Sequence, residues 1–79
     1  MAVTRWLVYS RQDCSLCDQL LRELTQVLGP DAAAQVQVLD VDDDPLLQQK
    51  YGRRVPVLLA DGEFVCAYQL DRDRLVAYL

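Results

Sequence analysis

Residues 3–28 read VTRWLVYSRQDCSLCDQLLRELTQVL, an apolar segment, a polar loop and a segment with helical periodicity in direct succession. Val3 to Tyr9 is apolar and β-branched enough to predict a buried first strand. After the loop Ser10 to Asp13, apolar residues recur every three or four positions from Cys17 to Leu28, as on one face of an amphipathic helix. Gly29-Pro30 is expected to end this helix.

The rest of the sequence predicts three more strands and two more helices. A carboxylate cap at Asp44 followed by Pro45 marks a helix start, and Asp61-Gly62 is a common two-residue turn between antiparallel strands. In chain order, the sequence predicts a strand over Gln35 to Val41, a helix from Pro45 to Tyr51, strands over Val55 to Leu59 and Glu63 to Tyr68, and a final helix over Asp71 to Leu79.

The resulting order, β-α-β-α-β-β-α, predicts one α/β domain over residues 1–79, with a four-stranded mixed sheet flanked by helices. Seventy-nine residues are too few for a second domain. The first strand, helix and strand should form a parallel, right-handed unit, and the hairpin should add two antiparallel strands to the same sheet. Because the first two strands are apolar nearly throughout, we expect helices to cover them.

The composition excludes several classes of function. The 12 acidic and 8 basic residues give a net charge of −4, which argues against nucleic acid or an anionic membrane as the main partner. No run of about eighteen apolar residues is present, so no transmembrane span is expected, and the N-terminal residues lack the features of a signal peptide. The absence of histidine excludes every mechanism that needs an imidazole. With no export signal visible, we expect a cytoplasmic protein, and we also expect a monomer.

The three cysteines indicate thiol chemistry rather than a disulfide-stapled fold, which normally has an even number. Cys14 and Cys17 lie where the loop after the first strand enters the first helix, and positions three apart face the same side of a helix. The unpaired N–H groups and the dipole at that end of a helix stabilise a thiolate. We expect Cys14, the more exposed sulfur, to attack a disulfide and the better buried Cys17 to resolve the mixed disulfide.

Two charged neighbours have opposite effects on the stability of the Cys14 thiolate. Arg11 adds positive charge three residues before it, whereas the carboxylate of Asp13 opposes the thiolate. A C-x-x-C pair also serves as half of a zinc site, but without histidine the remaining ligands would be Cys66 and one carboxylate, an uncommon set. Redox chemistry is therefore preferred and no metal site is predicted. The alternative is a redox-inactive or metal- or protein-binding module.

Arg11 to Cys17 resembles the basic-x-x-C-x-x-C active-site loop of the glutaredoxins, small members of the thioredoxin superfamily. Val55 to Leu59, VPVLL, resembles the family's Val-Pro strand start, and the Asp61-Gly62 hairpin leads to a final helix as the family's topology requires. The resemblance implies a thioredoxin-like fold in which Pro56 follows a cis peptide bond and faces the cysteines. It also implies a dithiol oxidoreductase for protein or low-molecular-weight disulfides, with no bound cofactor and with glutathione as one candidate reductant.

The chain departs from the glutaredoxin pattern in two places. Ser15 and Leu16 stand where the family carries a proline and an aromatic residue between the cysteines. Ten and eleven residues past the proline, Cys66-Ala67 replaces the family's Gly-Gly pair, with Leu70-Asp71 following. Because glycine permits a close backbone approach, this replacement alters the expected glutathione contact. The sequence is therefore identified as a divergent glutaredoxin-like branch.

Further residues are candidates for contacts with the substrate. Leu16 lies off the buried stripe of the helix and would be an exposed apolar contact beside the nucleophile. Arg53-Arg54 would grip a carboxylate of glutathione or of an acidic protein partner, unless the pair is merely solvated. Cys66 is either a third redox thiol or, more simply, a small buried residue of a strand. The predicted substrate-binding residues are Arg11, Leu16, Arg54, Val55 and Pro56.

Overall fold

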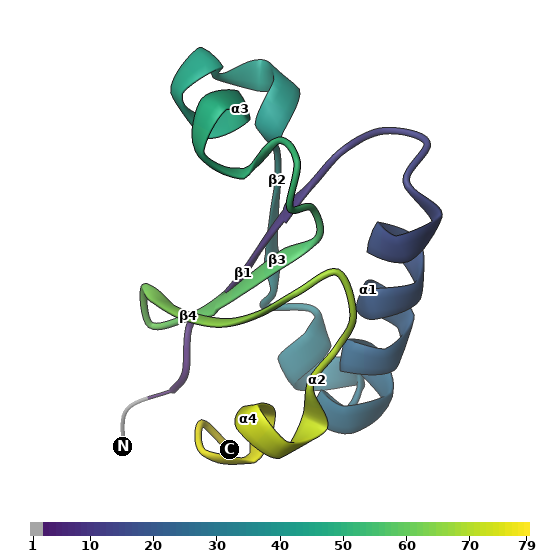
Figure 1. The fold of residues 1–79 in the computed structure, drawn as a ribbon. Helices are drawn as coiled ribbons and strands as arrows, with labels where there is room; N and C mark the ends of the chain where they lie inside the picture. Colours follow the sequence, from purple (N-terminus) through teal and green to yellow (C-terminus); the bar gives the residue numbers. More distant parts are fainter. Residues whose placement is uncertain (1–2) are drawn as a thin grey trace.

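The computed structural model describes residues 3–79, so Met1 and Ala2 of the predicted domain lie outside the described residues. Within that range the chain forms a four-stranded sheet with helices around it (Figure 1). The elements, in chain order, are β1 (Trp6–Ser10), α1 (Ser15–Leu28), α2 (Pro30–Ala33), β2 (Gln37–Asp40), the 3₁₀ turn η1 (Val41–Asp43), α3 (Pro45–Tyr51), β3 (Val57–Ala60), β4 (Glu63–Ala67) and α4 (Arg72–Val76). This order confirms the predicted α/β class, to which α2 and η1 are additions.

The sheet is mixed, as predicted. Its strand order is β2-β1-β3-β4, with β1 parallel to β2 and antiparallel to β3, and β3 antiparallel to β4. The hairpin between β3 and β4 turns at Asp61 and Gly62, which have φ values of 51° and 83°. Positive φ at both central residues is the type I′ arrangement of a two-residue hairpin, for which Asp-Gly is one of the preferred sequences.

The strand registers bring four connecting segments to one edge of the sheet. Tyr9 pairs with Val57, Val57 pairs with Ala67, and Ser10 pairs with Asp40. The segments that follow β1, β2 and β4 therefore leave the sheet at the same edge as the segment that precedes β3. We call this end of the strands the cysteine edge; it comprises segments 11–14, 41–44, 52–56 and 68–71.

The opposite edge of the sheet joins the two ends of the described chain. Thr4 lies just before β1, and its hydroxyl donates a hydrogen bond to the backbone carbonyl of Tyr78 at 2.8 Å. Trp6, the first residue of β1, also contacts Tyr78, with the two rings edge to face and their centroids 6.3 Å apart. The beginning and the end of the domain are thus held together on the side away from the cysteines.

The main apolar core lies between the sheet and the helices α1 and α4. Helix α1 buries Cys17, Leu20 and Leu24, each 1% exposed, and α4 buries Leu75 completely. Burying one leucine side chain contributes roughly 1.5–3 kcal/mol, so these contacts fix α1 firmly on the sheet. The buried residues of this cluster are Trp6, Val8, Leu20, Leu24, Leu58, Ala60, Val65, Cys66 and Leu75.

Three strands begin later than predicted, among them β2, which covers Gln37–Asp40 rather than Gln35 to Val41. β1 starts at Trp6 rather than Val3, whose side chain is 78% exposed and takes no part in the sheet. β3 starts at Val57 rather than Val55, because Pro56 has no N–H to donate to a neighbouring strand. All three strands keep the order that the sequence predicted for them.

The helices also differ from the prediction at their ends. Gly29 (φ 83°) ends α1 as predicted, but Pro30 begins α2 directly, since its fixed φ suits the first position of a helix. Helix α4 is shorter than the predicted Asp71 to Leu79, because Asp71 is its N-cap and residues 77–78 form a turn. Within residues 3–79, none of the helices combines the length and the apolar composition that crossing a bilayer requires.

β2 is less buried than predicted. The expectation that helices cover the first two strands is confirmed for β1, where Val8 is fully buried. It is wrong for β2, where Gln37 and Val38 are exposed. β2 is an edge strand, and the neighbouring α3 buries none of its own residues. The apolar pattern of a short strand does not reveal whether the strand lies at the edge of its sheet.

Candidate active site

Cys14 and Cys17 lie at the N-terminus of α1, as predicted. Cys14 is the N-cap residue, with an extended backbone (φ −107°, ψ 103°), and its sulfur accepts a hydrogen bond from the backbone N–H of Cys17 at 3.1 Å. The two sulfurs form a disulfide, and the Cα atoms are 5.2 Å apart. The pair therefore has a geometry in which a disulfide closes within one helical turn.

The two cysteines differ in exposure in the direction that the sequence predicted. Cys17 is 1% exposed and belongs to the buried face of α1, whereas Cys14 is only partly buried. Leu16 lies between them and is 39% exposed. Asp13 has φ 56°, a left-handed conformation that aspartate adopts more readily than most residues, and it turns the chain into the helix. Cys14 is therefore the more exposed residue of the pair.

Arg11 pairs with a carboxylate from another part of the chain. Its Nε donates to Oδ2 of Asp42 at 3.0 Å and its Nη2 donates to Oδ1 at 3.2 Å. Gln48 donates to the same Oδ1 at 2.9 Å. These hydrogen bonds, the one from Arg11 first, hold the pKa of the Asp42 carboxyl below its usual value. Arg11 thus links the segment before Cys14 to η1 and α3.

The loop before β3 runs beside the turn after β4. The peptide bond between Val55 and Pro56 is cis, as the family resemblance implied, and the buried Pro56 accepts a hydrogen bond from the backbone N–H of Tyr68 at 2.9 Å. The hydroxyl of Tyr68 donates to the backbone carbonyl of Arg53 at 3.3 Å. Tyr68 has φ 70° and is 50% exposed. This bridging role of Tyr68 was not predictable from the sequence, because a tyrosine does not signal a left-handed backbone.

An aromatic stack holds α3 against the end of β1. The rings of Tyr9 and Tyr51 are nearly parallel, at 18°, with their centroids 4.5 Å apart. The ammonium group of Lys50 lies 5.2 Å from the centre of the Tyr51 ring, within range of a cation–π contact. This stack compensates in part for the lack of buried residues on α3.

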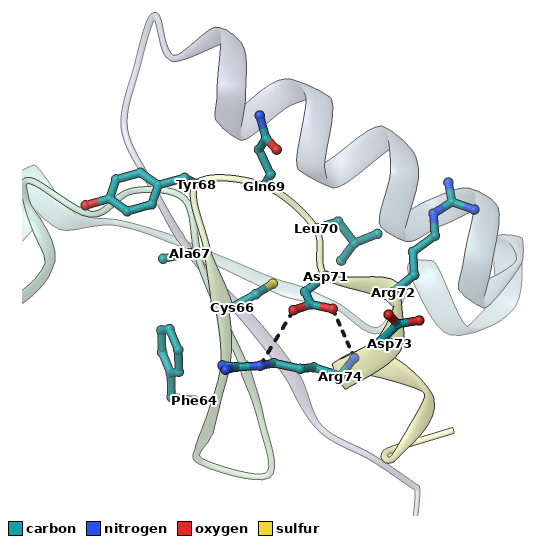
Figure 2. A pocket seen from close by; sticks show the side chains of 10 residues that line it. All are labelled: Phe64, Cys66, Ala67, Tyr68, Gln69, Leu70, Asp71, Arg72, Asp73 and Arg74. Atoms are coloured by element: carbon teal, nitrogen blue, oxygen red, sulfur yellow. Dashed lines mark hydrogen bonds and ion pairs between the residues drawn. The ribbon is translucent and has the colours of Figure 1, made fainter.

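Cys66 has a free thiol on β4 and is 5% exposed. Figure 2 shows its sulfur on the wall of a cavity of about 720 Å³ between β4 and α4, near Asp71. Asp71 caps α4 at the backbone N–H of Arg74 (3.2 Å) and pairs with the guanidinium Nε of the same residue (3.6 Å). Burial raises the pKa of the Cys66 thiol above its usual value, so the thiol stays protonated. This placement agrees with a small buried residue of a strand.

The acidic run between β2 and α3 caps the two helical segments. Asp40 accepts a hydrogen bond from the backbone N–H of Asp42 at 2.8 Å, and Asp44 accepts one from Leu46 at 2.9 Å. The second contact is the helix cap predicted from the sequence. Across residues 3–79, no group of three or more cysteine, aspartate or glutamate side chains is arranged to hold a metal ion.

The predicted substrate-binding residues all lie on segments of the cysteine edge or directly beside Cys14. Val55 is half-buried and Pro56 is buried, whereas Leu16 and Arg54 are exposed. Arg11 is at the same edge, but its guanidinium is engaged by a carboxylate. The structure thus brings the predicted residues to one end of the sheet and leaves Leu16 and Arg54 accessible there.

The chain matches known proteins over nearly its whole length. Residues 5–79 match the family described as Glutaredoxin-like domain (DUF836). No significant match joins the chain to a curated protein. The solution structure of protein Ne2328 from Nitrosomonas europaea is 33% identical, with a TM-score of 0.84, and the alignment covers 100% of this chain and 94% of that one.

Other solved structures extend the comparison. The X-ray structure of protein XcR50 from X. campestris is 34% identical, with a TM-score of 0.73 and 92% of each chain covered. A buckwheat glutaredoxin–glutathione complex is 21% identical, with a TM-score of 0.57, and the alignment covers 94% of this chain and 66% of that one. The first is similar in sequence and fold, whereas the second shares the fold alone.

The family match begins just before β1 and includes every element through α4. It contains the three features on which the resemblance rested: the cysteine pair at the start of α1, the Val55-Pro56 dipeptide before β3, and the Asp61-Gly62 hairpin that leads to α4. The chain therefore belongs to the glutaredoxin-like domain family and is a divergent member of the thioredoxin superfamily.

Proposed function

We propose that this protein is a thiol–disulfide oxidoreductase in which Cys14 is the nucleophile and Cys17 the resolving thiol. The observation that carries the proposal is the asymmetry of the pair: a partly exposed cysteine at the helix N-cap and a buried cysteine within disulfide reach. The backbone N–H of Cys17 donates to the Cys14 sulfur, and such a donor stabilises negative charge on the attacking atom.

The reaction proceeds by two exchanges. The Cys14 thiolate attacks one sulfur of a substrate disulfide, forms a mixed disulfide and releases the other substrate sulfur as a thiolate. The Cys17 thiolate then attacks the Cys14 sulfur, closes the Cys14–Cys17 bond and releases the second substrate thiolate. Two electrons pass from the protein to the substrate, and the released thiolates take up protons. An external thiol then reduces the Cys14–Cys17 disulfide by the reverse exchange.

The proposed substrates are protein or low-molecular-weight disulfides, handled by a monomer in the cytoplasm with no bound cofactor. Leu16 offers an apolar contact beside Cys14, and Val55 and Pro56 lie on the loop that shares the cysteine edge. Glutathione is a candidate reductant, since a buckwheat protein of the same fold is known in complex with it. Cys66-Ala67 at the position of the family's Gly-Gly pair argues for a modified mode of glutathione contact.

Single-turnover reduction of a disulfide peptide by the reduced protein tests this proposal. Cys14→Ser is expected to abolish reduction, because no accessible thiolate remains. Cys17→Ser is expected to accumulate the Cys14–substrate mixed disulfide, which mass spectrometry detects. Cys66→Ala is the matched control, since it removes a thiol and leaves the pair intact, and it should retain reduction. Full activity in Cys14→Ser would refute the assignment.

Equilibration in graded glutathione buffers gives a second test. A reversible two-electron transition with a midpoint between about −180 and −280 mV is expected, which is the range of known exchange proteins. A pair that never closes, or a disulfide that glutathione never opens, would instead support a redox-inactive module that binds a metal or another protein.

A further inference from the structure

Three basic side chains gather on one surface beside the candidate active site. Lys50, Arg53 and Arg54 are exposed and line a single cavity of about 550 Å³. They are three of the eight basic residues in a chain whose net charge is −4. The remaining walls are uncharged, formed by Pro45, Gln48 and Gln49. We call these six residues the cationic cavity.

The charges of the cationic cavity are not balanced from within the protein. Among residues 3–79 the ion pairs join Arg11 to Asp42 and Arg74 to Asp71, and neither involves this cavity. The contrast with the cavity beside Cys66 is direct, since Figure 2 shows its Arg74 held by a neighbouring carboxylate. A set of unpaired cations around a hollow is complementary to carboxylates supplied from outside.

The backbone that carries these cations is held in place. Arg53 accepts a hydrogen bond from the Tyr68 hydroxyl at 3.3 Å through its carbonyl, and Arg54 donates its N–H to the carbonyl of Tyr51 at 2.8 Å. The ammonium of Lys50 lies 5.2 Å from the centre of the Tyr51 ring. Because this backbone is already ordered, less conformational entropy is lost when a ligand binds, and the ligand's contacts have less to offset.

The cationic cavity adjoins the cysteine edge without including the reactive sulfur. Arg53 and Arg54 belong to segment 52–56, which leaves the sheet at the same edge as the loop that carries Cys14. Neither Cys14 nor Leu16 nor Pro56 lines the cavity. An occupant bonded to Cys14 must therefore continue along the protein surface to fill it. A polypeptide that extends beyond its own cystine meets this requirement.

We propose that the cationic cavity docks an acidic segment of a protein disulfide substrate, placing the substrate's disulfide at Cys14. The inference rests on the proposed oxidoreductase function and names its substrate class: polypeptides with glutamate or aspartate residues near a reducible disulfide. Opposite charges also speed the encounter, so the preference is expected in the second-order rate constant and is expected to weaken with salt.

The test compares two synthetic peptides of equal length, each with one internal disulfide, that differ in a flanking run of glutamates or glutamines. The rate constant for oxidation of the reduced protein is measured by acid quenching and mass spectrometry. Wild type is expected to favour the glutamate peptide about tenfold at low ionic strength and less than about twofold in about 0.5 M salt. This comparison needs no variant, so it does not depend on how a variant folds.

Variants then locate the preference. Arg53→Gln/Arg54→Gln is expected to lower the glutamate-to-glutamine rate ratio about fivefold, and it leaves intact the Arg53 carbonyl that Tyr68 contacts. The matched control, Arg5→Gln/Arg22→Gln, removes the same charge from exposed positions outside the cysteine edge and is expected to keep the ratio. An equal fall in the control would attribute the effect to net charge and overturn the proposal.

A third substrate, the mixed disulfide of glutathione with a single-cysteine neutral peptide, separates two sources of carboxylate. If Arg53→Gln/Arg54→Gln slows this substrate as much as the glutamate peptide, the cavity serves glutathione and the proposal is overturned. Equal wild-type rates for the two cystine peptides would refute docking alone. Exchange with none of the three substrates would refute the oxidoreductase function itself.

Discussion

Helices α1 and α3 attach to the same sheet by different kinds of contact. Helix α1 buries Cys17, Leu20 and Leu24, whereas α3 buries none of its residues. Helix α3 is held instead by the stack of Tyr9 on Tyr51 and by the neighbouring pair of Arg11 with Asp42. Apolar packing therefore holds the helix that carries the cysteine pair, whereas aromatic and polar contacts hold the helix beside the cationic cavity.

The difference teaches which part of the molecule responds to its surroundings. Apolar burial is indifferent to moderate changes of pH and ionic strength, whereas exposed ion pairs weaken with salt and with protonation of the carboxylate. The cysteine pair, proposed to carry out the chemistry, is therefore held by contacts that are insensitive to pH and salt. The cationic cavity, proposed to select the substrate, is held by contacts that weaken as pH and ionic strength change.

The largest expected effect is at the buried face of α1. Leu24→Ala is expected to lower the free energy of unfolding by about 2–5 kcal/mol, because it leaves a cavity in a fully packed site. The control on α3, Leu46→Ala, changes a residue that is 74% exposed and should cost less than about 0.5 kcal/mol. Urea unfolding measures both, and equal losses would contradict the contrast between the helices.

Alkylation of the reduced protein compares a core thiol with an edge thiol. Cys66 is expected to react with iodoacetamide on the order of 100-fold more slowly than Cys14 at pH 8. Its thiol is buried, and a buried thiol stays protonated, whereas only the thiolate reacts. Its raised pKa means that its rate should still be climbing at alkaline pH. Peptide mapping by mass spectrometry gives both rates, and denaturation in urea should remove the difference. Similar rates in the folded protein would show that β4 opens readily.

The aromatic attachment of α3 is tested by Tyr51→Leu. Loss of the stack on Tyr9 is expected to lower the free energy of unfolding by about 1 kcal/mol. The variant should also reduce the preference for acidic peptides, since the ring under Lys50 is lost. Tyr51→Phe keeps the ring and should preserve both properties. If the two variants behave alike, the stack does not hold α3.

The smallest effect is expected for the exposed carboxylate that pairs with Arg11. Because folding lowers the pKa of Asp42, its contribution to stability is present above the unfolded pKa and is lost as pH falls through the lower folded value. Asp42→Asn should therefore lower the Tm slightly at neutral pH and not at strongly acidic pH. Asp43→Asn, the adjacent carboxylate, is the control for thermal melts. A Tm difference that persists in acid would contradict this account.

Features that depend on a few neighbouring residues were predicted correctly from the sequence. The helical stripe beginning at Cys17, the Asp44-Pro45 helix start and the Asp61-Gly62 turn each depend on a few adjacent residues, and each is confirmed. The burial of Cys17 follows from its place on the same apolar stripe. The element order and the position of the cysteine pair were therefore predictable without a structure.

Contacts between distant segments were not predictable in this way. The ion pair of Arg11 with Asp42, which is 31 residues along the chain, had no signal in the sequence. The exposure of Val38 depends on β2 lying at the edge, which strand order alone decides. The bridge from Tyr68 to Arg53 requires the turn after β4 to meet the loop before β3. Each depends on how the elements assemble rather than on neighbouring residues.

The hydrogen bond between Thr4 and Tyr78 has a practical consequence for handling the molecule. It places both ends of the described chain at the edge of the sheet opposite the cysteine pair. Either end is therefore a suitable attachment point for a fluorescent partner protein or for an electrode surface. The dithiol would then point outward from the surface, and the proposed exchange with dissolved disulfides could be followed while the protein itself stays immobilised.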